Sequence, residues 1–323
     1  MSSDPWADLA NAIFRLSDRF AADRQTYEGF LPGSPAARDA KDEPHAGDWG
    51  QAPCRDTDIA GLHLAIMAVD HLTCLAGVFQ STRPFVFGPS AVARSATEVA
   101  ARGYYLLEPD LPSLERIRRH QNDRLSSLWD QRILVKDLDD EVAASACDAQ
   151  ISQILRGATQ SHLSPHQGKN YKPPRIGDSQ PSATMLVDQA VSKESRLGRT
   201  SYRALSAVAH GSRHGLRLFF TEMGALLDQE HGDVFGVLEA SPQKMALLLI
   251  GAPIAVSNLL NRLYNRFGWP EADADSEKFS MLETWGRVAD VPIPTGSVNG
   301  SPPQPPVPSS FLSDPRPIGG GGA

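Results

Sequence analysis

The chain has 323 residues, of which 41% are hydrophobic and 7% aromatic, and its 38 acidic residues outnumber its 31 basic residues to give a net charge of −7. This composition is typical of a soluble globular protein and excludes a fibrous or wholly disordered chain. The acidic balance also argues against a general nucleic-acid coat protein, which would be basic throughout. Residues 291–323 hold nine prolines and six glycines, which predicts a disordered tail after the folded body.

The N-terminus and the cysteines indicate a cytoplasmic protein. Charged residues interrupt the apolar positions of residues 1–20, as in an amphipathic helix and unlike a signal peptide. No stretch has the composition that we expect of a membrane-spanning helix, although residues 245–260 come closest. Three cysteines without CxxC spacing indicate neither a disulfide framework nor a zinc ribbon. Arginine outnumbers lysine by 24 to 7, a usage associated with GC-rich bacterial genomes.

Capping residues and hydrophobic periodicity predict helices over most of the chain. The first begins at Asp4 and runs to about Arg24, and residues 28–55 then form an irregular acidic connection. The next begins at Asp56 or Asp58 and is apolar nearly all round, which predicts a central, buried helix ending at Phe79. Further helices are expected over 88–107, 112–136, 139–156, 183–191, 199–220 and 242–267.

Evidence for strands is sparse. Residues 157–182 are rich in proline and predict a loop, and 234–238 is the one β-like run, which could pair with 216–220. We therefore expect an all-α fold, a bundle of five or six long helices with at most one short β-hairpin. The expected organisation is an N-terminal helix and irregular acidic connection (1–55), a helical bundle domain (56–290) and a disordered tail (291–323).

Motifs of several common enzyme classes are absent from the sequence. It contains no GxGxxG after a strand, no GxxxxGK[ST], no GxSxG and no HExxH. Dinucleotide-binding, P-loop, α/β-hydrolase and zincin folds are therefore poor matches.

The most informative segment is 199–217, where a local excess of positive charge interrupts the acidic chain. A helix of 100° per residue places six polar side chains of this segment on one stripe: Arg199, Arg203, Ser206, His210, His214 and Arg217. Arginine forks bind phosphate oxygens, and histidine transfers protons near neutral pH. Together these groups are the components of metal-independent phosphodiester cleavage. The alternative is a solvated face of an amphipathic helix, which Gly211 and Gly215 would weaken or end.

A resemblance to a known family rests on the same segment. Arg203 followed after six residues by His210, late in an all-helical domain, resembles the Arg-x(4–6)-His motif of the HEPN superfamily. HEPN proteins are dimeric four-helix bundles, many of them RNA-cutting toxins or phage-defence effectors and others non-catalytic nucleotide- or protein-binding modules. The resemblance implies that Arg203 binds phosphate, that His210 is the acid or base, and that the protein is a homodimer. Active members usually have a polar residue where this chain has Ala204, which favours the non-catalytic alternative.

Arg94, Glu98 and Arg102 form a second candidate group on the helix after Pro89. They are spaced four residues apart, the spacing of a solvent-exposed ion pair. The alternative is that Glu98 faces inward and orients His210 or Arg203, with Arg94 in support.

A metal site is the third alternative. His210 and His214 are four residues apart, and His63 or His71 could supply a third ligand, as in metal proteins of the DinB helical-bundle type, which such a site would resemble. The sequence offers no matching spacing for that third ligand, so we expect no metal and no cofactor.

Three functions follow as hypotheses. The first is a HEPN-like, RNA-directed protein, an endoribonuclease of toxin or phage-defence type that needs no metal. The second is a non-catalytic helical module that binds a nucleotide or a protein, and the third is a histidine–metal enzyme. The expected partners are RNA or a nucleotide, a second copy of the chain, and an antitoxin or other protein, with no membrane.

Overall fold

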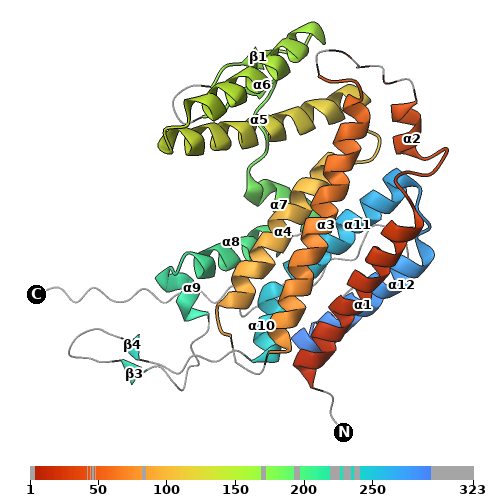
Figure 1. Ribbon diagram of the computed structural model, residues 1–323. Helices are drawn as coiled ribbons and strands as arrows, with labels where there is room; N and C mark the ends of the chain where they lie inside the picture. Colours follow the sequence, from red (N-terminus) through yellow and green to blue (C-terminus); the bar gives the residue numbers. More distant parts are fainter. Residues whose placement is uncertain are drawn as a thin grey trace, which may run out of the picture.

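The computed structural model describes residues 4–41, 43, 45, 47, 49–81, 85–168, 172–192, 197–218, 226–227, 234–235 and 241–291. Of the tail expected to be disordered, 291–323, all residues after 291 lie outside the described part of the chain. Helices make up most of the described chain (Figure 1): α1 Pro5–Thr26, α2 Pro35–Ala40, α3 Pro53–Phe79, α4 Gly88–Leu106, α5 Ser113–Asp137, α6 Glu141–Gln160, α7 Ala183–Val191, α8 Leu197–Ala209, α9 Arg213–Arg217, α10 Pro242–Leu249, α11 Gly251–Phe267 and α12 Ala272–Ala289. The expected all-α fold is confirmed.

The strands are short and form two antiparallel pairs. β1 (Pro165–His166) pairs with β2 (Arg175–Ile176), and β3 (Leu226–Leu227) pairs with β4 (Val234–Phe235). The first pair lies in the segment expected to be a loop, so the described chain has one pair more than expected. The partner expected for the 234–238 run was wrong, because residues 213–217 are helical in α9 and cannot serve as a strand.

Local sequence signals set several helix starts. The Asp4 carboxylate accepts a hydrogen bond from the Trp6 backbone N–H at 3.0 Å, and Pro5 occupies the first helical position, as predicted. The start expected for α3 was wrong by a few residues, because Pro53 takes the first position and the Glu43 carboxylate accepts hydrogen bonds from the Cys54 and Arg55 N–H groups at 3.2 and 3.3 Å. Asp58 is fully buried and forms an ion pair with Arg266 of α11 instead.

The helix expected over 199–220 ends at Ala209. Gly211 has φ +62°, its N–H donates to the Val208 carbonyl at 3.0 Å, and the Ser212 N–H donates to the Ala207 carbonyl at 2.9 Å. These two bonds form a Schellman motif, which closes a helix with a left-handed glycine. The chain then turns back, and the Ser212 hydroxyl accepts a hydrogen bond from the Gly215 N–H at 3.1 Å to start α9.

The C-terminal helices also differ from the expectation. The single helix expected over 242–267 is broken at Ile250 into α10 and α11, which meet at a bend of 43°. Pro253 lies just after the break, and its missing N–H removes one helical hydrogen bond. No helix was expected over 272–289, but α12 forms there and buries Ala274, Met281 and Trp285.

The buried side chains form two hydrophobic cores. The larger core joins α1, α3, α4, α7, α8, α10, α11 and α12. The smaller core lies under the α5–α6 hairpin, where Trp49 packs with Ile117, Leu125 and Ile176. Figure 1 shows this hairpin lying across one end of the longer helices.

α3 is long and apolar enough to cross a membrane by length and composition alone. This corrects the expectation that no such stretch exists. The bent α10–α11 pair would be a second candidate if it formed one span. In the structure α3 packs against α1, α4 and α11 and contributes to the larger core. A helix buried among other helices is apolar for this reason as well.

Candidate functional site

Arg203 and His210 lie on the same face of α8. The His210 N–H donates to the Ser206 carbonyl at 3.0 Å, so helical geometry continues as far as His210. Residues seven apart on a helix share a face, and both side chains are exposed. Within the described residues, neither side chain forms an ion pair or a hydrogen bond with another group.

His214 and Arg217 do not extend this face, contrary to the predicted stripe. Both belong to α9, which folds back after the left-handed turn at Gly211. The two helices touch closely, since a Cβ at Gly215 would lie 2.4 Å from the Ala207 carbonyl carbon. His214 is exposed, and the Arg217 side chain lies outside the described atoms.

Ser206, Arg94 and Glu98 join α8 to α4. Arg94 Nε donates to the Ser206 hydroxyl at 3.1 Å. The Tyr202 hydroxyl donates to Glu98 Oε2 at 3.0 Å, and burial raises the pKa of that phenol. Arg94 and Glu98 also pair with each other at 3.7 Å. Glu98 therefore contacts Tyr202, and it forms no hydrogen bond with His210 or Arg203.

Arg199 belongs to a different environment. Its Nη2 lies 3.0 Å from Oδ2 of Asp188, and its backbone N–H donates to Oδ1 of the same carboxylate at 3.0 Å. Arg199 also lines a pocket of about 530 Å³ between α4, α5, α7, α8 and α11, which we call the tyrosine pocket. Its walls are formed by Tyr104, Tyr105, Glu108, Arg119, Met185, Asp188, Gln189, Ser192, Arg199 and Arg262.

Two arginines of the tyrosine pocket rest on aromatic rings. The Arg119 guanidinium lies 3.9 Å from the centre of the Tyr105 ring, and its Nη1 donates to Glu108 at 2.6 Å and to the Tyr105 carbonyl at 2.8 Å. Arg262 lies over the Tyr104 ring and donates to the Tyr104 carbonyl. Cation–π contacts and backbone acceptors thus hold both guanidinium groups in fixed positions.

Some arginine donors in the tyrosine pocket remain without protein acceptors. In the described part of the chain, Arg262 has no carboxylate partner, and Nη2 of Arg119 forms no hydrogen bond. Burial lowers the pKa of Arg262, with the tyrosine ring and Glu108 opposing and Arg119 adding to the shift. A guanidinium group stays protonated in proteins, so Arg262 is a cation.

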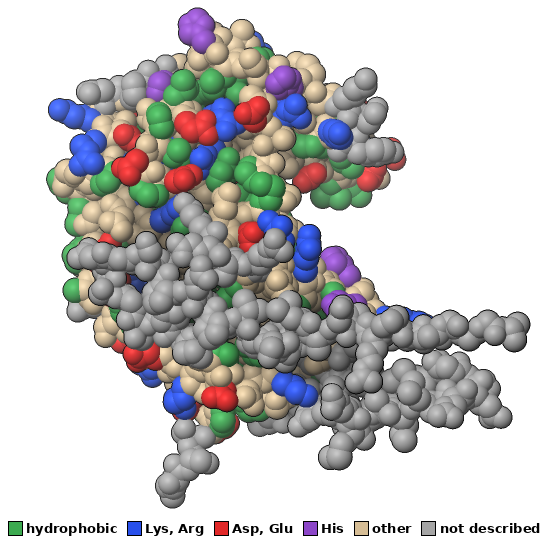
Figure 2. Space-filling view, turned by 180° about the vertical axis from the view of Figure 1, so that it is seen from behind, with side chains coloured by type: hydrophobic (Ala, Val, Ile, Leu, Met, Phe, Trp, Pro, Cys, Tyr) green, Lys and Arg blue, Asp and Glu red, His purple; other side chains and the backbone are tan. Residues whose placement is uncertain are grey.

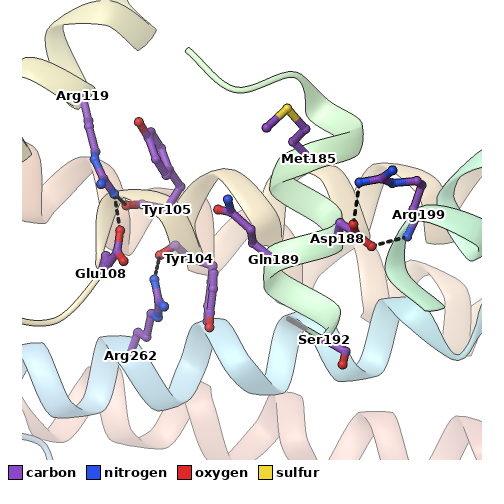
Figure 3. Close-up of a pocket in the computed structure, with 10 residues that line it drawn as sticks. All are labelled: Tyr104, Tyr105, Glu108, Arg119, Met185, Asp188, Gln189, Ser192, Arg199 and Arg262. Atoms are coloured by element: carbon purple, nitrogen blue, oxygen red, sulfur yellow. Dashed lines mark hydrogen bonds and ion pairs between the residues drawn. The ribbon is translucent and has the colours of Figure 1, made fainter. Parts of the chain in front are cut away.

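Figure 3 shows how the pocket is divided. Gln189 extends from α7 toward Tyr104 and Tyr105, on the side where Arg119 and Arg262 also lie. Asp188 and Arg199 face each other on the other side of α7. The cations therefore form two groups, an Arg119–Arg262 pair over the tyrosines and Arg199 beyond them.

The surface near the tyrosine pocket is hollowed. Figure 2 shows an indentation at the edge of the molecule, between the end formed by α5 and α6 and the part that carries α8 and α9, with basic and histidine side chains on one lip. The exposed side chains of these types on α8 and α9 are Arg203, His210, Arg213 and His214. The walls of the tyrosine pocket include residues of α5 as well as residues of α7 and α8.

The described part of the chain contains no cluster of metal-binding side chains. Among the described residues, no three His, Cys, Asp or Glu side chains are placed to hold one metal ion. His63 is exposed on α3 and His71 is half-buried, and neither contacts His210 or His214.

Sequence reasoning found Arg199 but missed the rest of the tyrosine pocket. The residues of the tyrosine pocket come from five helices and the positions just after two of them. They are therefore far apart in the sequence and form no motif of fixed spacing. The available signals were the adjacent tyrosines Tyr104 and Tyr105 and the arginine-rich run 116–119, either of which is also common on an ordinary helix surface.

Comparison with protein-family models, curated proteins and solved structures finds no match to this chain. The HEPN resemblance therefore stays a prediction, and it rests on the spacing of Arg203 and His210.

Proposed function

We propose that this protein binds a nucleotide in the tyrosine pocket and acts as an RNA-directed or nucleotide-binding helical protein. The observation that carries the proposal is Arg262, a half-buried cation on the pocket wall without a carboxylate partner among the described residues. Together with Arg119 it offers N–H donors to a phosphate group. A pocket of about 530 Å³ is in the range that holds small organic ligands.

The rest of the pocket suits the other parts of a nucleotide. The exposed Gln189 side chain offers both a donor and an acceptor, which the edge of a base requires. The rings of Tyr104 and Tyr105 supply aromatic surface beside the cations, and bases stack on such surfaces. Both guanidinium groups are already held in place, so a ligand would not bear the full entropy cost of ordering them.

The position of α8 supports an RNA strand as the extended form of this ligand. Arg203 lies one helical turn beyond Arg199, which lines the pocket. A strand with one nucleotide in the pocket would pass Arg199 and reach the exposed face that carries Arg203 and His210. Phosphate contacts of this kind act without base specificity.

Equilibrium binding tests the proposal. AMP and a fluorescein-labelled eight-nucleotide RNA should both bind the wild-type protein at low salt, and Arg262→Gln should weaken both by tenfold or more. Arg102→Gln is the matched control, because Arg102 pairs with Asp123 at 2.6 Å outside the pocket. This variant should bind AMP and the RNA with affinities within twofold of wild type. Equal binding by the two variants, or no binding by wild type, would reject the pocket as a nucleotide site.

Endoribonuclease activity is the second candidate function. It is favoured by the exposure of Arg203 and His210 on one face of α8, which leaves the imidazole available as acid or base and the guanidinium available to a phosphate. Labelled RNA incubated with protein in excess EDTA should be cut by wild type but not by Arg203→Ala or His210→Ala. Intact RNA at high protein concentration would contradict this candidate and leave nucleotide binding as the function.

A further inference from the structure

A second pocket shares Arg262 with the tyrosine pocket, and we call it the α2 pocket. It measures about 450 Å³ and lies between α2, the α4–α5 connection, α5 and α11. Its walls are formed by Pro35, Arg38, Asp39, Leu107, Pro109, Asp110, Leu111, Arg116, Arg262, Asn265 and Arg266. The polar wall is rich in arginine, and the apolar wall consists of two leucines and two prolines.

Arg116 is the unusual residue of this pocket. It is 2% exposed, and its Nη1 donates to the Leu106 carbonyl at 2.8 Å. Its Nε is shielded from solvent and has no hydrogen-bond partner, and no carboxylate among the described residues forms an ion pair with it. A buried charged donor without an acceptor is costly, and folded proteins rarely keep one without a use for it.

The carboxylates nearby are already engaged. Arg266 donates to both oxygens of Asp58, at 2.8 and 2.9 Å, and pairs with Asp39 at 2.7 Å. The remaining acidic group of the wall, Asp110, is exposed at its edge. Burial and the nearby Arg266 cation lower the pKa of Arg116 to about 10, against the opposing effects of Asp58 and Asp39, so the Arg116 charge is only partly balanced by the protein.

We propose that the α2 pocket binds a small organic carboxylate, with its carboxylate group at Arg116 and its aliphatic part on the leucine and proline wall. A carboxylate supplies the planar pair of acceptors that a guanidinium edge matches. The apolar wall adds affinity in proportion to the surface that the ligand's hydrocarbon part buries. This site is separate from the proposed nucleotide site, although Arg262 lines both pockets.

Titration calorimetry with hexanoate tests the site. Hexanoate should bind the full-length protein, while acetate, hexan-1-ol and inorganic phosphate should each bind at least tenfold more weakly, because each lacks the aliphatic part, the charge or the planar carboxylate. Equal binding of hexanol or phosphate would overturn the proposed ligand class.

Variants locate the binding. Arg116→Gln removes the cation, and Leu111→Glu places a negative charge on a half-buried part of the wall, so each should weaken hexanoate binding by tenfold or more. Leu111→Glu keeps the test decisive if Arg116→Gln does not fold. Arg199→Gln, in the tyrosine pocket, should leave hexanoate binding within twofold. Loss of binding in Arg199→Gln, or wild-type binding in Leu111→Glu, would overturn the proposal.

Discussion

Arg94 of α4 and Ser206 of α8 are joined by a hydrogen bond of 3.1 Å from Nε to the hydroxyl oxygen. The bond connects residues 112 positions apart and holds α8 against α4. Ser206 is half-buried and its hydroxyl contacts α4, while the side chains of Arg203 and His210 are exposed. The polar residues of this segment thus lie in two different environments, the contact with α4 and the solvent-exposed face.

The first prediction distinguishes the residue that packs against α4 from the residues that face solvent. Ser206→Ala should lower the free energy of unfolding by about 1 kcal/mol, since it leaves Arg94 Nε without its acceptor. Urea unfolding measures the change. In an Arg94→Ala background the same substitution should lower the free energy of unfolding by clearly less, because the two residues share one interaction.

Arg203→Ala is the control for this prediction. Its side chain is exposed and forms no bond within the described residues, so stability should change by no more than about 0.5 kcal/mol. A neutral Ser206→Ala would contradict the packing role that we assign to Ser206.

Features set by neighbouring residues were predictable from the sequence. The start of α1 at Asp4 and Pro5, and the shared face of Arg203 and His210, depend only on local spacing. The tyrosine pocket was not predictable, because α4, α5 and α11 bring its residues together only after folding. The buried pair of Asp58 and Arg266 joins residues 208 positions apart, and nothing near Asp58 in the sequence indicates its partner.

The α8–α9 turn gives the second prediction. Gly211→Ala should destabilise the protein by about 1 kcal/mol, because a non-glycine residue is strained at φ +62°. Gly215→Ala should have the larger effect on α9, since its Cβ would lie 2.4 to 2.5 Å from backbone atoms of Ala207 and Val208. Hydrogen exchange over 213–217 should then become faster.

Gly77→Ala is the matched control and should change the free energy of unfolding in the opposite direction. Gly77 lies inside α3, and a Cβ there would meet no atom within 4 Å. Alanine should therefore stabilise the helix by up to about 1 kcal/mol. Equal effects at Gly77 and Gly211 would contradict the assigned turn.

The three cysteines give the third prediction, through their different exposure. Cys74 is exposed, while Cys54 and Cys147 are buried. Burial and the nearby Glu43 raise the pKa of Cys54 to about 12, so its reactive thiolate is scarce at neutral pH. A thiol reagent such as DTNB should modify one cysteine in the native protein and three in denaturant. Rapid modification of the native Cys74→Ser variant would contradict this assignment.

His120 gives the last prediction, a dependence of stability on pH. Its side chain is 8% exposed and its Nδ1 lies 3.2 Å from the Thr57 hydroxyl. Burial and the Arg124 charge lower its pKa from 6.5 to about 4, against the opposing effect of Asp123. Below pH 6.5 the unfolded chain binds a proton that the folded protein does not, so stability falls as the pH drops toward 4.

The loss due to His120 should reach up to about 3 kcal/mol, because each pKa unit corresponds to about 1.4 kcal/mol. His120→Gln lacks the titrating group, so urea unfolding between pH 7 and pH 4.5 should show a smaller loss of stability for the variant than for wild type. His63→Gln changes an exposed histidine of α3 and should keep the wild-type slope. If the His120→Gln and wild-type curves run parallel, carboxylates rather than His120 cause the acid sensitivity, and the imidazole is not held neutral by its buried site.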